Sequence, residues 1–466
     1  MKPNIIVILI DDLGWKDLAC CGSEFYETPN VDLLASNSVR FTQAYAACPV
    51  CSPSRAALLT GKSPARLGIT NYIHNGEGAR GRLVDAPFIR QLNHDETTYA
   101  SILQAEGYAT WHVGKWHLGA EDYWPTSHGF DINIGGCDMG HPTHGYFSPY
   151  KIPTLEDGKD GEYLTDRLTQ EAVNLIRAHA KAQPSQPFLL NMWHYAVHTP
   201  IQAPDELVEK YRHKAEKLGL PHEAALIEGE FFPVEHKRSL RVTRRIVQSD
   251  PAYAAMIENL DTNIGVLLDA VNEVGALDNT LIVFTSDNGG LATAEGSPTC
   301  NLPLAEGKGW TFDGGTRVPL IISCPGATGG VASDVPVTSM DLFPTLLDIA
   351  GVNGAADPHC DGKSLLALLH GGSAEDLQAR PLFWHYPHYG NQGGTPSAAV
   401  RKGAWKLIRF MESGDQRLFD LQADPGELDN LAAAHPQKVL ELATLLSGWQ
   451  DDAGANYPNH NEAPQF

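Results

Sequence analysis

The sequence has no run of about 18 apolar residues, which is the length that a membrane-spanning helix requires. We therefore expect no transmembrane segment. It also has no Asn-x-Ser/Thr sequon, which argues against a eukaryotic secreted or lysosomal protein and favours a bacterial one. Its eight cysteines form no dense framework in 466 residues, so we do not expect disulfides to be its main source of stability.

Basic residues are also scarce. Lys and Arg number 34 against 56 Asp and Glu, which gives a formal net charge of −22. A surface with this charge repels nucleic acid and anionic lipid, so we expect neither nucleic acid nor a membrane as a partner. An anionic ligand would need local cations that overcome the overall field.

The rest of the composition is that of a globular chain, with 42% hydrophobic and 19% charged residues. A length of 466 residues exceeds one ordinary domain and suggests a large α/β domain with an appended module. The first apolar run, residues 5–10, ends in two aspartates and not in a small-residue cleavage site. We interpret it as a buried strand and not as a signal peptide, which predicts either a cytosolic protein or one whose leader has been removed.

Apolar runs typical of strands alternate with helical patterns through most of the chain. The predicted strands are 4–10, 39–45, 109–113, 188–193, 280–285 and 320–323, and the predicted helices are 31–38, 98–106, 165–180, 253–274 and 341–350. Such alternation indicates an α/β fold with a large, mostly parallel sheet flanked by helices on both faces. Ligands of these sheets bind at the carboxyl ends of the strands.

The pattern changes near residue 375. Short strands at 382–386, 398–401, 405–410 and 417–421, followed by a helix at 436–449, predict a small antiparallel sheet with a closing helix. We therefore expect a catalytic α/β domain over residues 1–375. A smaller α+β subdomain over 376–466 is expected to contribute to the substrate pocket.

A cysteine begins the most distinctive stretch, Cys-Ser-Pro-Ser-Arg-Ala-Ala-Leu-Leu-Thr-Gly at residues 51–61. We predict a helix with Pro53 at its first position and its end at Gly61. The amide groups and dipole at the start of such a helix favour an anion beside Cys51. Cys48 and Cys51 have the spacing of a thioredoxin or zinc half-site, but no second cysteine pair lies at a suitable distance.

Two acidic pairs follow two apolar strands: Asp11 with Asp12, and Asp287 with Asn288. A single Asp in such a place is usually a turn or cap residue. Two pairs together favour a site for a hard cation, because carboxylate and amide oxygens suit Ca²⁺ or Mg²⁺ better than zinc.

Three further segments place cations and imidazoles after strands. Residues 114–119 read Gly-Lys-Trp-His-Leu-Gly and contain Lys115 and His117; residues 193–200 contain His198 before Thr-Pro; residues 306–310 contain Lys308. Each residue alone is more often a solvated lysine or a partly buried histidine. Their common position after strands favours a shared cleft.

These segments together resemble the motifs of the type I, formylglycine-dependent sulfatases of the alkaline phosphatase superfamily, and the resemblance covers nearly the whole chain. It implies that a maturation enzyme, of the formylglycine-generating or radical type, oxidises Cys51 to formylglycine, the nucleophile. The implied ligands of Ca²⁺, with Mg²⁺ second, are Asp11, Asp12, Cys51, Asp287 and Asn288. The implied catalytic residues are Cys51, Arg55, Lys115, His117, His198 and Lys308. The resemblance favours a periplasmic or secreted protein, and a cytoplasmic one remains an alternative.

The predicted reaction is hydrolysis of a sulfate ester on a carbohydrate, with a galactose-type unit preferred. Candidate substrate-binding residues are His141 and His144 in a His-rich loop, His385 and His388 in the C-terminal segment, and Arg317 after a Gly-Gly-Thr. The basic run at 236–245 is interpreted as a solvated helix face, with a polyanionic glycan contact as the alternative. Two other functions stay open: a phosphatase or phosphonate monoester hydrolase of the same superfamily, and a catalytically inactive glycan-binding relative.

Overall fold

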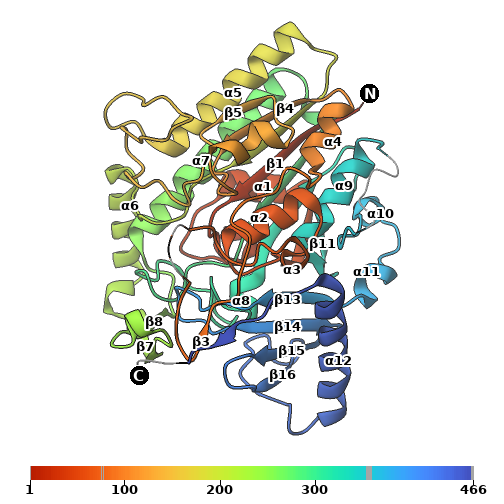
Figure 1. Cartoon of the computed structure of the whole chain (residues 1–466). Helices are drawn as coiled ribbons and strands as arrows, with labels where there is room; N and C mark the ends of the chain where they lie inside the picture. The colour runs from red at the N-terminus through yellow and green to blue at the C-terminus, as the bar shows by residue number, and fades with distance from the viewer. Residues whose placement is uncertain (1, 75, 77, 353–358, 463–466) are drawn as a thin grey trace.

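A large mixed sheet forms the centre of the protein (Figure 1). The computed structural model describes residues 2–74, 76, 78–352 and 359–462. Within these residues the sheet has nine strands in the order β11-β2-β10-β9-β1-β6-β4-β5, with β12 beside β2. Their bounds are β1 (Asn4–Ile10), β2 (Val39–Tyr45), β4 (Ala109–Gly114), β5 (Ile132–Ile134), β6 (Phe188–Trp193), β9 (Thr280–Ser286), β10 (Arg317–Ser323), β11 (Val331–Ser333) and β12 (Val337–Thr338).

Most neighbouring strands run parallel, which confirms the predicted fold class. The exception is β10, which runs antiparallel to both β9 and β2. The segment between β9 and β10 contains one short helix, α8 (Asp313–Thr316), and no long crossover helix. An antiparallel strand needs no crossover of that kind, so the chain can return directly from the end of β9.

Strand β1 lies in the middle of the main sheet, and its side chains pack into hydrophobic cores on both faces of that sheet. Its alternate side chains Ile6, Ile8 and Ile10 belong to one core cluster, and Ile5, Val7 and Leu9 belong to another. The first cluster includes residues of α1 (Pro29–Ser36), α5 (Leu164–Ala182), α6 (Asp205–Lys217) and α7 (Pro251–Glu273). The second includes residues of α2 (Cys51–Thr60), α3 (Pro64–Leu67), α4 (Tyr99–Ala105), α9 (Leu342–Ile349), α10 (Leu366–Leu369) and α11 (Glu375–Ala379). None of the helices in the described part of the chain has the length and apolarity needed to cross a bilayer.

The C-terminal segment forms a second, antiparallel sheet with a helix across it, as predicted (Figure 1). Its elements are β13 (Leu382–Tyr386), β14 (Ser397–Lys402), β15 (Trp405–Phe410), β16 (Gln416–Asp420) and α12 (Pro436–Ala453). Leu442 and Leu446 of α12 pack on one face of this sheet. On the other face, Trp384 and its neighbours pack against Tyr45 of the main sheet. The division of the chain at residue 375 stays a prediction.

The basic run at 236–245 does not form one helix, so that prediction is wrong: only His236 and Lys237 are helical, in the short 3-10 helix η5 (Glu235–Lys237). Arg241–Arg245 is strand β8, which pairs with β7 (Leu226–Phe231) in an antiparallel hairpin. Arg244 is held by ion pairs with Glu230 and Glu306, both at 2.8 Å. The arginines of this run therefore lie mainly on a strand, and Arg244 is paired there with acidic side chains. A second small pairing joins β3 (Leu83–Val84) to β17 (Asn459–His460).

A buried ion cluster links the two sheets. The Nζ of Lys406 on β15 lies 2.7 Å from Asp313 Oδ1 and 2.9 Å from Glu427 Oε1. Tyr45 on β2 donates its hydroxyl to Asp313 Oδ2 at 2.8 Å. The Lys406 and Glu427 side chains are fully buried and that of Asp313 nearly so, so each charge depends on its partners for compensation.

We expect Lys406→Met to lower the free energy of unfolding by about 3–5 kcal/mol, because it leaves two buried carboxylates without their ammonium partner. Chemical denaturation monitored by tryptophan fluorescence measures the change. The matched control is Lys402→Met on β14, whose ammonium is half exposed and pairs only with Glu441; that change should stay within about 1 kcal/mol. Equal effects of the two variants would contradict the cluster's role.

Candidate active site

The motif residues meet at the carboxyl edge of the main sheet. Asp11 and Asp12 follow β1, Lys115 and His117 follow β4, His198 lies five residues after β6, and Asp287 and Asn288 follow β9. Strand pairing explains this convergence, since β1 lies between β6 and β9 and runs parallel to both. Ile10 is opposite Ser286, so the two acidic pairs leave the sheet side by side.

Helix α2 presents Cys51 to this edge. Val50 is extended and Cys51 is the first helical residue, so the helix begins two residues earlier than predicted and Pro53 is its third residue. Proline is still tolerated there, because the first amide groups of a helix have no carbonyl partner within it. The helix ends, as predicted, at Gly61 in a left-handed conformation (φ 70°).

His117 faces Cys51. Its Nδ1 lies 3.3 Å from the Cys51 Sγ, and its Nε2 lies 2.8 Å from the carbonyl oxygen of Ile73. A carbonyl can only accept, so Nε2 carries the proton and Nδ1 presents a lone pair to residue 51. Burial, reinforced by the Lys115 charge, holds the pKa of His117 well below its ordinary value. The ring is therefore neutral near pH 7 and can accept a proton at Nδ1.

The acidic residues are held by two buried cations. Lys115 Nζ lies 2.6 Å from Asp11 Oδ2. Arg55 Nε donates to Asp287 Oδ2 at 2.8 Å, and Nη2 lies 2.8 Å from the same oxygen as an ion pair. The Arg55 guanidinium lies 5.3 Å from the centre of the Trp193 ring. These four charged side chains have almost no exposure to solvent. The sequence motif thus places each cation against a carboxylate rather than leaving it free in the cavity.

Burial raises the pKa of Asp11 well above the usual carboxyl range, although the Lys115 charge opposes this. Asp287 and Asp12 raise it further through repulsion. Asp12 behaves differently: burial also favours its neutral form, but Lys308 and His198 lower its pKa below the ordinary value. Three carboxylates this close together are expected where a cation shares their charge.

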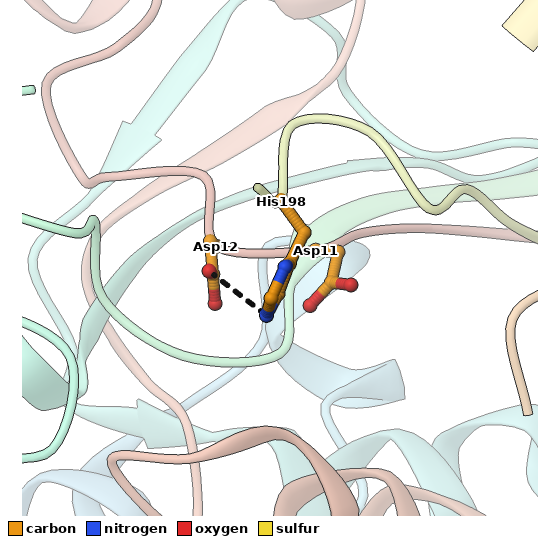
Figure 2. Close-up of side chains that lie close together, drawn as sticks. All are labelled: Asp11, Asp12 and His198. Atoms are coloured by element: carbon orange, nitrogen blue, oxygen red, sulfur yellow. Dashed lines mark ion pairs between the residues drawn. The ribbon is translucent and has the colours of Figure 1, made fainter. Parts of the chain in front are cut away.

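The donor set fits a hard divalent cation. The buried Oδ1 atoms of Asp11 and Asn288 have no hydrogen-bond partner, and buried polar atoms are rarely left so. Asp11, Asp12 and His198 each offer a ligand atom within 4.8 Å of the others (Figure 2). Oxygen atoms dominate the set, which suits Ca²⁺ or Mg²⁺. The fit therefore rests on the two unpartnered oxygens and on the clustering of Asp11, Asp12 and His198.

Lys308 and His198 form a second contact beside Asp12. Lys308 Nζ lies 2.8 Å from both Asp12 oxygens and donates to His198 Nε2 at 2.9 Å. His198 Nδ1 lies 3.0 Å from the Thr199 carbonyl oxygen, so it carries the ring proton. Burial and the Lys308 charge lower the pKa of His198 well below its ordinary value. An ammonium and an imidazole are thus available next to Asp11, Asp12 and Asp287, which we call the acidic cluster.

A cavity of about 370 Å³ opens over these groups. It is lined by Val50, Cys51, Tyr72, Ile73, His74, His117, Asp138, Gly140, His141, His198, Thr199, Glu295, Lys308, Asn391 and Gln392. The His141 ring stacks on His198, with 5.8 Å between ring centres and 9° between planes. His141 therefore lines the cavity beside His198, and its substrate-binding role stays a prediction.

The other predicted substrate-binding residues are not among those that line this cavity. His385 and His388 are buried and bonded elsewhere, His385 to the Asn456 carbonyl and to Gln450, and His388 to Thr70. Arg317 donates to the Thr42 carbonyl and stacks on Trp15, so these contacts engage its guanidinium outside the cavity lining. His144 is exposed and bonds Thr143. We do not carry these four residues into the function proposed below.

Several lining residues escaped the sequence prediction. Asp138 had one usable signal, its position three residues before His141 in the same loop. Glu295, Asn391 and Gln392 had none, because they come from loops without a motif. Asn391 and Gln392 both donate to the Glu295 carboxylate, so the C-terminal segment reaches the cavity.

Comparison with known proteins agrees with this geometry. The model of the sulfatase family matches residues 3–352, and that of the C-terminal region of N-sulphoglucosamine sulphohydrolase matches residues 307–447. The chain is 31% identical to the N-acetylgalactosamine-6-sulfatase of Mus musculus over 98% of this chain and 82% of that protein. It is also 31% identical to a sulfatase of Formosa agariphila, over 96% of this chain and 87% of that protein.

Solved structures show the same fold. The crystal structure of Ps i-CgsB in complex with k-i-k-neocarrahexaose superposes with a TM-score of 0.76 at 28% identity, covering 97% of this chain and 93% of that one. The phosphonate monoester hydrolase of Agrobacterium radiobacter, at 22% identity, has a TM-score of 0.66 over 99% of this chain and all of that chain, and shares the fold. Because the family match spans every residue from Asp11 to Lys308 that the strands bring together, the chain belongs to the sulfatase family and is a sulfuric ester hydrolase.

Proposed function

We propose that the enzyme hydrolyses a sulfate ester on a carbohydrate, with residue 51 as the nucleophile. One observation carries the proposal: Cys51 faces His117 Nδ1 at 3.3 Å in a cavity that also holds Lys308, His198 and the acidic cluster. A redox or zinc cysteine would need none of these neighbours. A sulfate ester needs all of them, because negative charge moves onto its oxygens during cleavage.

Two groups would complete the site. A maturation enzyme would convert Cys51 to formylglycine, whose hydrate supplies an oxygen nucleophile. Asp11, Asp12, Asp287 and Asn288 would hold Ca²⁺ together with residue 51, and the cation supplies Lewis acidity toward the sulfate oxygens. The unpartnered Oδ1 atoms of Asp11 and Asn288 support this ligand set.

The protein's own side chains then have distinct tasks. Lys308 and His198 bind the sulfate oxygens, and their shared proton at Nζ and Nε2 can pass to the departing alcohol oxygen. His117 Nδ1 accepts a proton from residue 51. Arg55 and Lys115 fix Asp287 and Asp11 in place and balance their charge.

A carbohydrate substrate is supported by the relatives and by the cavity. The mouse relative is named for N-acetylgalactosamine, and the superposed crystal structure contains a neocarrahexaose. Tyr72, His74 and His141 bring aromatic rings to the cavity wall, which suits sugar rings. A galactose-type unit is our preferred substrate.

The test is sulfate release from a panel of sulfated mono- and oligosaccharides, measured by ion chromatography. Sulfate and phosphate esters of one sugar, compared directly, separate a sulfatase from a phosphatase or phosphonate monoester hydrolase. Faster release of phosphate would contradict the proposal. Binding of the sugars without release of sulfate would support a catalytically inactive relative instead.

We expect chelation of divalent cations to lower the melting temperature, and Ca²⁺ to restore it more fully than Mg²⁺. At a Ca²⁺ concentration 100 times the dissociation constant, the stabilisation is about 2.7 kcal/mol. Differential scanning fluorimetry measures the shift. Asn288→Ala removes one unpartnered oxygen and should weaken the response, whereas Asn279→Ala, at the opposite edge of the sheet, should preserve it. An unchanged response in Asn288→Ala would argue against that ligand.

A further inference from the structure

The lining of the cavity over Cys51 carries charges of both signs. Lys308 is the one ammonium group among the described residues that line it, and Asp12 matches its charge at 2.8 Å. The same lining includes two carboxylates, those of Asp138 and Glu295. Both side chains are exposed to the solvent-filled space and not buried in the protein. A ligand that enters the cavity therefore meets two carboxylates as well as the Lys308 ammonium.

Asp138 and Glu295 reach the cavity from separate elements. Asp138 lies in the loop after β5, and no hydrogen bond or ion pair to its carboxylate is present among the described residues. Glu295 lies in a turn where Ala294 and Glu295 both adopt left-handed backbone conformations, with φ of 58° and 49°. Such conformations are unfavourable for these residues and concentrate at functional sites.

The position of Glu295 is fixed. Asn391 and Gln392 donate to its two oxygens, and Lys237 donates to Asn391 on the side away from the cavity lining. Glu295 and Tyr72 line the same cavity, and burial together with the Glu295 carboxylate raises the pKa of the Tyr72 hydroxyl. The carboxylate is thus a built part of the cavity wall and not a freely moving surface group.

A second cavity of about 300 Å³ adjoins the first and shares Tyr72, His74 and Asn391 with it. Its charged lining residues are Asp85, Glu235 and Arg80, with His236 beside them. Cations therefore do not outnumber acids there either. A polysulfated or uronate-rich chain would require a lining with more cations than acids, since the net charge of the protein is already −22.

We propose that Asp138 and Glu295 make the enzyme selective for sugars that carry the scissile sulfate as their one acidic group. This inference rests on the proposed function. The two carboxylates accept hydrogen bonds from sugar hydroxyls, which are donors, and repel a second sulfate or a carboxylate on the same or the adjoining ring. The substrate class is then a monosulfated, otherwise neutral glycan.

The experiment compares kcat/KM for a monosulfated galactose and for its disulfated counterpart, matched in every other position, using the matured enzyme. Two unit charges about 6 Å apart in a partly hydrated cavity alter binding about tenfold. We expect the wild type to prefer the monosulfated sugar by about that factor, and high ionic strength to reduce the preference. Asp138→Asn should reduce it about threefold or more, and Asp138→Asn with Glu295→Gln should reduce it further.

The control is Asp278→Asn, which removes the same charge just before β9, at the opposite edge of the sheet. It should leave the ratio of the two kcat/KM values unchanged. Equal or faster turnover of the disulfated sugar by the wild type, or a ratio that neither cavity variant alters, would overturn the inference while leaving sulfatase activity intact. A complete lack of sulfate release from both sugars would instead contradict the proposed function, and this inference with it.

Discussion

A Cys51→Ala protein is expected to release sulfate at least about 10⁴-fold more slowly than the wild type, because loss of a covalent nucleophile removes most of the catalysis that the other groups support. Alanine has no thiol to oxidise, so neither the cysteine nor the aldehyde form can exist. The change is small in volume and lies at the first residue of α2, so the fold should persist. Sulfate release from the best sugar of the panel measures the effect.

Cys48→Ala provides the matched control. Cys48 is three residues away and equally buried, but it is not among the residues that line the cavity. If the two cysteines acted as a redox pair or a zinc half-site, both variants would lose activity. If residue 51 acts alone, Cys48→Ala keeps its activity.

Mass spectrometry of the peptide that contains residue 51 adds a second readout, since the thiol and the aldehyde differ in mass. We expect the aldehyde in active wild-type and Cys48→Ala protein. Sulfatase activity that persists in Cys51→Ala would contradict the nucleophile assignment. Full activity in wild-type protein that contains only the thiol would contradict the conversion.

Much of the catalytic core could be predicted from sequence because its acidic residues, Lys115 and His117 directly follow strands. Asp11 and Asp287 are far apart in the chain, yet β1 and β9 pair in parallel with Ile10 opposite Ser286. Once both strands are recognised as buried and parallel, their ends must coincide. The apolar runs were strong enough to give β1, β6 and β9 nearly residue by residue.

The substrate-facing wall could not be predicted in this way. Glu295 takes its place through a turn with left-handed residues and through bonds to Asn391 and Gln392, nearly 100 positions later. No periodicity encodes such a contact. The prediction for Arg317 shows the opposite case. Its position after the last catalytic motif suggested a place in the substrate pocket, but its guanidinium contacts the Thr42 carbonyl and the Trp15 ring and does not line the cavity. The local sequence gives the type of each side chain but does not determine which distant residues it contacts in the fold.

Lys308→Met is expected to lower kcat by about 10²–10³-fold, the usual cost of removing one preorganised charged donor from an active site. Methionine keeps the length and apolar stem of the side chain but loses the ammonium that touches both Asp12 oxygens and His198 Nε2. The sulfate then loses a cation, and the leaving oxygen loses its route to a proton. Steady-state kinetics with the preferred sugar separate kcat from KM.

The size of this effect also distinguishes catalysis from structure. Lys210→Met removes an exposed ammonium that pairs with Glu27 and Glu258, and it should change kcat less than about twofold, because exposed ion pairs contribute little. Lys308→Arg keeps the charge in a different shape and should recover part of the activity lost in Lys308→Met. If Lys308 only supported the fold, activity would follow the melting temperature across these variants. Because its ammonium lies between Asp12 and His198 at the cavity wall, we expect kcat to fall even where the melting temperature is restored by Ca²⁺.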